Sequence, residues 1–415
     1  RAMAAQVKLR VFSLNCWGIH FLSNKCAQRY EMIGDLLERE HHDIVLLQEV
    51  WSERDFLFLK RKLVSSHPYS HYFRSGVIGS GLAVFSKHHV QDALLSPYTL
   101  NGYPFMVHHG DWFGGKAVGL VILDVFGLKT NVYITHLHAE YSRTKDDYLP
   151  HRIVQSWELL QFVRHTTGNA DVVIVGGDLN MHPKDLGNRL IRAHTGLRDC
   201  YLDTNMFEGC EEGITLIADN HFTKKQDLIP FEKGIRIDYI LIKGSGSVNV
   251  RCESMSTTKG SVPDKPFPYS DHEALTTELV ILCSEGTASL PVSEQINTTV
   301  QACAVVKEGL DRTEALQVKA MRMLAAGLLL LLLQLLVFCS GGCASLSMWL
   351  LGAACLGLLV SGTLLYIFFT MQLKALREAE AQMKLSSANL QARLSGLSGS
   401  VPSLFDCSPK LQREE

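Results

Sequence analysis

The 415-residue sequence has almost no net charge, no regular cysteine pattern and no apolar leader before its first predicted strand. With a net charge of −2 and a pI of about 6.8, the chain does not have the excess of basic residues typical of proteins that bind nucleic acid regardless of sequence. A local basic groove remains an alternative. The eleven cysteines form an odd set without a CxxC pair, which predicts reduced thiols and no tetrahedral zinc site. Because no apolar stretch precedes Val7, we expect no secretory signal and a cytosolic start.

One long stretch lacks charged side chains altogether. Between Met323 and Leu373 there is no Asp, Glu, Lys, Arg or His. About 20 apolar residues suffice to cross a bilayer, so the tract predicts two transmembrane helices, 323–339 and 345–370, joined by a turn at 340–342. Basic residues flank both outer ends, which predicts that both face the cytosol from an internal membrane such as the endoplasmic reticulum. A buried hairpin of a soluble domain is the disfavoured alternative, since core helices rarely stay free of charge over such a length.

Polar segments divide the remainder of the chain. They predict one large domain at 7–283, a linker at 284–302, a juxtamembrane helix at 303–322 and a polar tail at 372–415. Asn297 begins an Asn-Thr-Thr acceptor sequence, which the cytosolic placement predicts to be unused. Apolar residues of the tail recur at helical spacing, which favours a short amphipathic helix over a dimerising coil.

Apolar, β-rich runs alternate with helical patterns in the large domain. We predict strands at 9–14, 44–47, 82–85, 118–125, 132–135, 172–175, 235–242 and 274–281, and helices at 30–38, 55–63 and 151–162. Some strand runs alternate apolar and polar residues, whereas others are continuously apolar. This mixture predicts two sheets that share a buried core, with helices on the outer faces.

Polar residues stand where the first predicted strands end. Glu49 closes an apolar run, and a carboxylate there needs a partner or a metal ion, for which Mg²⁺ is the natural candidate. Asn15 ends the first strand, where its amide can orient Glu49 or the waters of the metal. Each residue taken alone has a plainer reading as a strand-end cap.

A second group follows the strand at 172–175. Gly177 allows the backbone to bend, so Asp178 and Asn180 can point to one side, fix an attacking water and bind a developing oxyanion; an ordinary Asx-turn is the alternative. Asp238 lies among strand-forming residues and is expected to be buried and paired. We predict that it holds the imidazole of His272 in one tautomer, which makes that histidine a better base.

Two further side chains are candidates for contacts with substrate phosphate. His136 is a predicted donor to a phosphoryl oxygen or to the leaving group, whereas His138, His151 and the pair at 108–109 are expected either to support the site residues from behind or to be structural. Residues 110–116 match the first seven positions of a phosphate-binding P-loop. Ala117 replaces the hydroxyl residue that should hold Mg²⁺, and a strand is predicted where a helix should begin. Nucleotide binding is therefore not predicted, but Lys116 can still face the site.

The ordered set of these residues resembles the endonuclease/exonuclease/phosphatase superfamily. It consists of Asn15, Glu49, His136, Asp178 with Asn180, Asp238 and Ser270-Asp271-His272. The resemblance implies a four-layer α/β/β/α sandwich, Mg²⁺ on Glu49, activation of water by His272 or Asp178, and no covalent enzyme intermediate. We also predict Asn15 and Asp271 to belong to the metal site.

Five stretches are similar to the magnesium-dependent neutral sphingomyelinases of that superfamily. They cover residues 15–18, 71–76, 100–104, 109–113 and 135–141. The similarity implies hydrolysis of sphingomyelin, with choline lysophospholipids as further substrates, by a protein that ends in a two-helix transmembrane hairpin. The expected partners are the lipid substrate and the bilayer, without nucleic acid. We predict Lys116 and Trp112 to bind substrate, and Trp112 with neighbouring aromatic residues can form an apolar rim, although a core cluster is the simpler alternative.

Two other functions remain open from the sequence. A membrane-tethered nuclease or inositol-phosphate phosphatase can use the same residues, but the near-neutral charge disfavours the nuclease. A catalytically silent membrane scaffold is disfavoured because every expected catalytic position is filled. The oligomeric state and the mode of regulation are not predicted.

Overall fold

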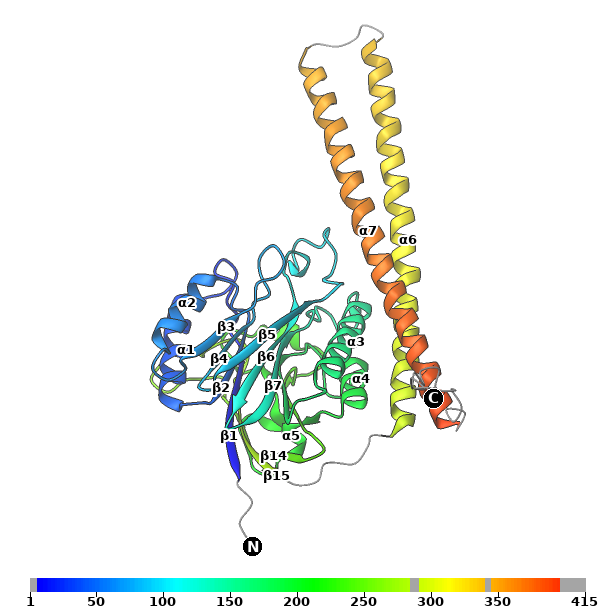
Figure 1. Ribbon diagram of the computed structural model, residues 1–415. Coiled ribbons are helices and arrows are strands. Elements are labelled where there is room, and N and C mark those ends of the chain that lie inside the picture. The colour runs from blue at the N-terminus through cyan, green and yellow to red at the C-terminus, as the bar shows by residue number, and fades with distance from the viewer. Residues whose placement is uncertain (1–5, 284–290, 340–344, 396–415) are drawn as a thin grey trace, which may run out of the picture.

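The computed structural model describes residues 6–283, 291–339 and 345–395. Its large domain is a sandwich of two β-sheets with helices on both outer faces, and a long helical hairpin projects from one side of it (Figure 1). The predicted four-layer α/β/β/α arrangement is therefore confirmed. The two sheets contain most of the strands that the apolar runs predict.

The first sheet has seven strands in the order β10-β14-β15-β1-β2-β4-β3. These are β1 (Val7–Asn15), β2 (Ile44–Gln48), β3 (Tyr69–Tyr72), β4 (Ala83–Ser86), β10 (Phe207–Glu208), β14 (Val248–Thr257) and β15 (Leu275–Cys283). The second sheet has six strands in the order β5-β6-β7-β8-β13-β9. These are β5 (Val90–Pro97), β6 (Ala117–Val125), β7 (Leu128–His136), β8 (Val172–Asp178), β9 (Arg198–Asp199) and β13 (Asp238–Gly244).

Three buried clusters separate the four layers. The largest lies between the sheets, where alternate residues of both inner faces meet, among them Leu46, Ile134 and Ile240. A second cluster packs the first sheet against α1 (Cys26–Glu40) and α2 (Glu53–Lys62). A third packs the second sheet against α3 (Leu149–Thr166) and α4 (Leu186–Thr195). The helices cover the sheets because each presents one apolar face to them.

Short elements complete the domain. They are α5 (Cys200–Asp203), the 3₁₀ turns η1 (Asp111–Phe113), η2 (Glu211–Gly213) and η3 (Lys225–Leu228), and the two-stranded ribbon of β11 (Leu216–Ile217) with β12 (Gly234–Ile235). One strand predicted at 235–242 is divided between β12 and β13. The division occurs because Ile237 and Asp238 donate their backbone N–H groups to the Thr215 hydroxyl, each at 3.2 Å, instead of continuing one ladder.

Two very long helices follow the sandwich: α6 (Val292–Cys339) and α7 (Ser345–Leu394). The expectation that a linker extends to residue 302 is wrong, because α6 already begins at Val292. Its polar first turns are ordered by docking: Ala302 is buried, and the hydroxyl of Thr299 lies 2.8 Å from Nε2 of His194 on α4. The rest of the expected linker, residues 284–290, and the turn predicted at 340–342 lie outside the described residues.

The first half of α6 and the second half of α7 pack against the domain, as does Phe368 near the middle of α7, and the two helices also pack against each other. Leu373, Leu376 and Met383 of the expected polar tail are buried with Trp157 of α3 in one cluster, so the first part of this tail is a docked amphipathic helix. Residues 396–415 of the tail lie outside the described residues. Both α6 and α7 contain a stretch long and apolar enough to cross a membrane, and neither stretch is buried in the described structure. The two helices thus indicate a membrane-anchored protein.

Candidate active site

Most of the predicted site residues lie at one end of the two sheets. Asn15 is the last residue of β1, and Glu49 directly follows β2, which runs parallel to β1. In the second sheet, His136 ends β7 beside Asp178, the last residue of β8. Asp238, the first residue of the antiparallel strand β13, pairs with Asp178. The strand ends of the two sheets therefore bring these side chains together at one edge of the sandwich.

The amide of Asn15 joins the two sheets. Its Nδ2 donates hydrogen bonds to Oε1 of Glu49 at 3.1 Å and to Oδ2 of Asp178 at 3.0 Å. Its Oδ1 accepts the backbone N–H of Trp17 at 3.0 Å, so the residue also serves as the strand-end cap considered from the sequence. Glu49 has a φ of 57°, a left-handed conformation that is unfavourable for a residue with a side chain. The fold holds this strain at the point where the carboxylate enters the site.

Asp178 forms the Asx-turn that the sequence offered as the alternative, and it also contacts Asn15. Its Oδ1 accepts the backbone N–H of Asn180 at 2.8 Å, which is an Asx-turn, while Oδ2 faces Asn15. The glycines before it lie within β8 instead of forming the expected turn. Gly177 has a φ of 140°, and a Cβ atom there would lie 2.0 Å from the carbonyl oxygen of Thr135. Only glycine therefore allows β8 to approach β7 this closely.

The predicted pair of His272 and Asp238 is present. Nδ1 of His272 lies 2.8 Å from Oδ2 of Asp238, and the backbone N–H of His272 donates to the Ser270 hydroxyl at 3.3 Å. Asp238, His272 and Asp178 place ligand atoms within 4.8 Å of one another, so they can hold a metal ion. The second oxygen of Asp238, Oδ1, is buried and has no hydrogen-bond partner. A buried carboxylate oxygen in this position fits a cation, because otherwise its desolvation is uncompensated.

The electrostatics of the cluster follow from its burial. Burial, reinforced by the neighbouring charge of Asp238, raises the pKa of Asp178 to about 7. Burial acts to lower the pKa of His272, but the carboxylates of Asp238, Asp271 and Asp178 outweigh it and raise this pKa well above its usual value. Closely spaced carboxylates without a nearby cation compete for protons. A divalent ion would relieve their repulsion.

His136 is held as a neutral imidazole. Its Nε2 lies 3.3 Å from Nζ of Lys116 and 3.4 Å from Oδ2 of Asp178, and burial together with the Lys116 charge sets its pKa well below the usual value. Nδ1 of His136 is buried without a partner. The carbonyl oxygen of Leu137 accepts hydrogen bonds from Lys116 at 2.9 Å and from Nδ2 of Asn180 at 2.9 Å. Lys116 thus faces the site, as the sequence predicts.

Asp271 directly precedes His272 in the chain, whereas Trp112 lies in η1 beside Asp111. Oδ1 of Asp271 accepts the hydroxyl of Ser270 at 3.1 Å, and burial raises the pKa of Asp271 to about 6. The ring of Trp112 packs edge-on against Phe113, with 5.1 Å between centroids, and is 39% exposed. The geometry therefore joins Asp178, Asp238 and His272 more tightly than it joins Asp271 to Glu49.

Comparison with known proteins shows the family to which the chain belongs. A model of the endonuclease/exonuclease/phosphatase family matches residues 12–272, which include every strand end described above. The chain belongs to this family. Human sphingomyelin phosphodiesterase 2 is 46% identical to it over 384 residues, which cover 91% of either chain. The predicted kinship with neutral sphingomyelinases is thereby confirmed.

Solved structures of other proteins share this fold at low sequence identity. Sphingomyelinase C from Streptomyces griseocarneus superposes with a TM-score of 0.52 and 18% identity, covering 66% of this chain and 99% of its own. A variant of beta toxin from Staphylococcus aureus with bound magnesium ions has a TM-score of 0.50 and 18% identity, covering 65% of this chain and 99% of its own. The sandwich accounts for this coverage.

Asp111 belongs to the site region of this family member but was not predicted from its sequence. Its Oδ1 lies 2.6 Å from Nζ of Lys116, and both side chains are almost fully buried. The hydroxyl of Tyr141 donates to Oδ2 of Asp111. Burial opposes ionisation of Asp111, but the ammonium of Lys116 keeps the pKa of Asp111 below its usual value. The sequence contains one signal for this pair, an acidic residue five positions before Lys116, but sequence spacing alone does not show that the two side chains meet.

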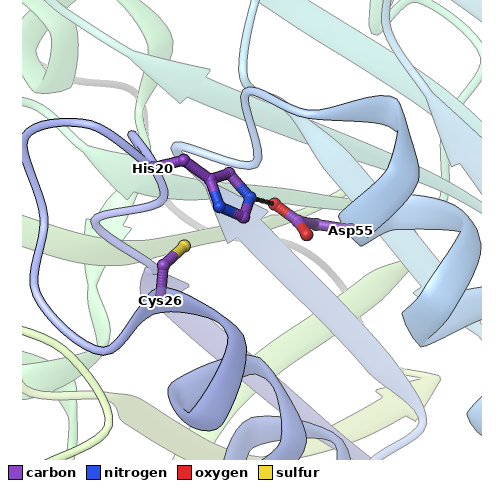
Figure 2. A group of neighbouring side chains, drawn as sticks. All are labelled: His20, Cys26 and Asp55. Atoms are coloured by element: carbon purple, nitrogen blue, oxygen red, sulfur yellow. Dashed lines mark hydrogen bonds and ion pairs between the residues drawn. The ribbon is translucent and has the colours of Figure 1, made fainter.

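A second group of potential metal ligands lies beside the site. His20, Cys26 and Asp55 converge from the loop after β1, the start of α1 and the first turn of α2 (Figure 2). Nε2 of His20 lies 2.6 Å from Oδ2 of Asp55, and the thiol of Cys26 faces the carbonyl oxygen of Gly18 at 3.8 Å. The sequence gives no sign of this group, because its members come from three separate segments and do not form a pair at ligand spacing. Its internal hydrogen bond fastens the loop after β1 to α2.

Proposed function

We propose that this protein hydrolyses sphingomyelin to ceramide and phosphocholine with Mg²⁺ as its cofactor. The observation that carries the proposal is the cluster of Asp178, Asp238 and His272, joined through Asn15 to Glu49. The family match supports phosphodiester chemistry, and the name of the 46% identical human relative supports the substrate. The same site accepts choline lysophospholipids in this proposal, because their phosphodiester bond is the same.

The residues present fit a hard divalent cation. Glu49 and Asp178 supply carboxylate oxygens, and the unpartnered Oδ1 of Asp238 supplies another. Asn15 holds Glu49 and Asp178 in fixed positions, and Asp271 adds negative charge nearby. When bound, the cation stabilises negative charge on the phosphoryl oxygens. Magnesium is favoured over zinc because the donors around Glu49 are oxygen-rich.

The two histidines have different proposed roles: His272 accepts a proton, and His136 donates a hydrogen bond. His272, held at Nδ1 by Asp238, is the proposed acceptor, at Nε2, of a proton from the attacking water. A cation on the neighbouring carboxylates would offset the negative charge that raises the pKa of His272, so that the neutral imidazole is available as the base. The water oxygen bonds to phosphorus as its proton passes to His272, and the bond from phosphorus to the ceramide oxygen breaks. The ceramide oxygen takes up a proton from solvent water, and His272 then releases its proton to solvent. His136 is neutral, so it donates a hydrogen bond to the phosphoryl group or leaving oxygen without adding a positive charge of its own.

Lys116 and Asn180 supply donors for the phosphate. Both donate to the carbonyl oxygen of Leu137, and the ammonium of Lys116, paired with Asp111, lies 3.3 Å from Nε2 of His136. Trp112, partly exposed near this lysine in sequence, is the proposed contact for the choline headgroup, because an aromatic face attracts a quaternary ammonium.

Residues 323–339 and 345–370 are the proposed transmembrane helices, and 7–283 is the catalytic domain. The basic residues that flank the hairpin, Lys319 and Arg322 before it and Lys374 and Arg377 after it, support a cytosolic domain on an internal membrane such as the endoplasmic reticulum. In this placement Asn297 carries no glycan. A glycosidase-sensitive mass shift that disappears in Asn297→Gln would reverse the orientation.

A substrate panel tests the proposal. The full-length protein in mixed micelles is assayed with sphingomyelin, lysophosphatidylcholine, nicked duplex DNA and phosphoinositides, each with Mg²⁺ or with chelator. We expect Mg²⁺-dependent release of phosphocholine from sphingomyelin. Cleavage of DNA or of phosphoinositides alone would establish the nuclease or phosphatase alternative, and no turnover of any substrate would favour a membrane scaffold.

A further inference from the structure

Two neighbouring loops expose large apolar side chains to solvent. Val77 and Ile78 follow β3 and are 88% and 54% exposed, whereas Phe105, Val107 and Trp112 lie between β5 and β6 and are 47%, 66% and 39% exposed. Single exposed apolar residues are common on soluble proteins, but a contiguous group marks a contact surface. We call these five side chains the apolar loop surface.

Backbone hydrogen bonds join the two loops into one unit. The N–H of Ile78 donates to the carbonyl oxygen of Phe113 at 3.1 Å, and the N–H of Gly115 donates to that of Gly79 at 2.8 Å. The backbones of the two loops approach so closely that a Cβ atom on Gly115 would lie 2.3 Å from the carbonyl carbon of Ser75. The apolar loop surface is therefore held in place by the fold.

The surface continues into the helical hairpin. The ring of Phe105 meets that of Phe368 on α7 edge-on, with 6.3 Å between centroids, and Tyr103 meets the same ring at 6.2 Å. Leu373 and Leu376, beyond Phe368 along α7, are buried against the domain, whereas Leu364, before it, is 62% exposed. Phe368 thus marks the level at which α7 leaves the domain, and the hairpin projects from the side of the domain where these loops lie (Figure 1).

Few charges oppose contact of these loops with an apolar environment. Within residues 76–80 and 103–113, Asp111 is the one residue with a carboxylate or basic chain, and it is buried against Lys116. Tyr103, His108 and His109 are the other titratable groups; Tyr103 is buried, and the ring of His109 is stacked on Tyr141 with 3.8 Å between centroids. Burying the loop tips in lipid would therefore desolvate no unpaired charge.

We propose that the apolar loop surface enters the interfacial zone of the bilayer that carries the hairpin. This inference rests on the proposed membrane function and deepens it, since η1 carries both Trp112 and Asp111, whose partner Lys116 faces the site. Contact with lipid at these loops holds the site entrance against the membrane, where a sphingolipid headgroup is presented. The hairpin tethers the domain, and the loops set its orientation.

Photocrosslinking tests the contact without requiring turnover. The full-length protein in sphingomyelin and phosphatidylcholine vesicles carries p-benzoylphenylalanine in place of Phe105 or, as matched control, of Phe126. Phe126 is 74% exposed but follows the far end of β6, a nine-residue strand about 30 Å long that starts beside Lys116. We expect lipid adducts by mass spectrometry at position 105 and none at 126. Adducts to Phe368 or Tyr103, which the ring of Phe105 already contacts, are expected beside the lipid adducts. Equal lipid labelling at both positions, or no lipid adduct at 105, would overturn the proposal.

Kinetics supply a second test. The variants Ile78→Asp and Val107→Asp are expected to lower turnover of vesicle sphingomyelin about tenfold, with a smaller effect on a short-chain soluble analogue. Phe126→Asp serves as the control and leaves both activities unchanged. Equal losses on vesicles and soluble analogue in the loop variants would contradict a role in lipid contact. Absence of all turnover would refute the proposed function but leave the crosslinking result to decide the membrane contact.

Discussion

His272 and Asp238 are separated by 34 positions in the sequence, yet Nδ1 of the imidazole lies 2.8 Å from Oδ2 of the carboxylate. The carboxylate fixes which ring nitrogen faces Asp238 and leaves Nε2 for chemistry. Asp178, which ends the strand paired with the strand of Asp238, completes the cluster. The proposed base and the proposed cation ligands are therefore parts of one hydrogen-bonded unit.

Replacing the proposed base tests its role directly. His272→Ala is expected to lower turnover of sphingomyelin by roughly 10²–10⁴-fold, because the attacking water loses its proton acceptor. The matched control is His89→Ala, an exposed histidine before β5. Rates are measured as phosphocholine release at saturating Mg²⁺. Activity of His272→Ala near that of the wild type would reassign the base.

Glu49 is expected to control the response to Mg²⁺. Glu49→Gln removes the charge that holds the cation but preserves the hydrogen bonding shape, so the Mg²⁺ concentration at half-maximal activity should rise by about tenfold or more. Glu53→Gln, whose side chain is 50% exposed, is the control. An identical Mg²⁺ titration for Glu49→Gln and the wild type would exclude Glu49 from the metal site.

The buried pair of Asp111 and Lys116 is expected to be essential for stability. Asp111→Asn leaves the ammonium of Lys116 buried without its counter-charge, which should lower the free energy of unfolding by about 3–5 kcal/mol. Glu211→Gln breaks the exposed pair with Lys233 and should cost less than about 1 kcal/mol. Denaturant titration in detergent compares the two. Equal, small losses would show that the pair around Lys116 is dispensable.

Acid should destabilise the fold through buried histidines. Burial lowers the pKa of His42 from 6.5 to about 3, so below pH 6.5 the unfolded chain binds a proton that the folded protein refuses. The contribution is complete above pH 6.5 and is lost progressively as the pH falls toward 3, by about 1.4 kcal/mol at pH 5.5. His42→Gln should therefore reduce the loss of unfolding free energy between pH 7.5 and 5.5. The same pH dependence in both proteins would be inconsistent with a neutral buried His42.

The docked part of α7 should contribute to the stability of the catalytic domain. Met383 is fully buried with Trp157 and Leu376, so Met383→Ala should cost about 2–5 kcal/mol. Leu385 lies on the same helix but is 65% exposed, and Leu385→Ala should change stability by less than about 0.5 kcal/mol. Thermal unfolding followed by loss of activity separates the two variants. Identical midpoints would mean that this helix is not part of the domain.

The strands and the residues at their ends could be predicted from the sequence because their signals are local. Apolar runs ended at Asn15, Glu49 and Asp178, and strand ends of a sandwich meet at one edge, so convergence followed from pattern alone. The pairing of His272 with Asp238 could be predicted for the same reason. The roles assigned to the individual side chains remain predictions, which the variants above test.

Other features depend on contacts between distant segments. Asp111 meets Lys116 because the chain turns back between η1 and the start of β6, and no periodicity marks that turn. The early start of α6 depends on His194 of α4, which meets Thr299, so its polar sequence resembled a linker. Local composition could not indicate either contact, because each is created by the tertiary fold.

Release of phosphocholine from sphingomyelin by the full-length protein, titrated with Mg²⁺ after treatment with chelator, tests the central claim most directly. The buried carboxylates of Asp178 and Asp238 require a cation in this account, so chelator should abolish release and Mg²⁺ should restore it in a saturable manner. Undiminished release in the presence of chelator would contradict the account.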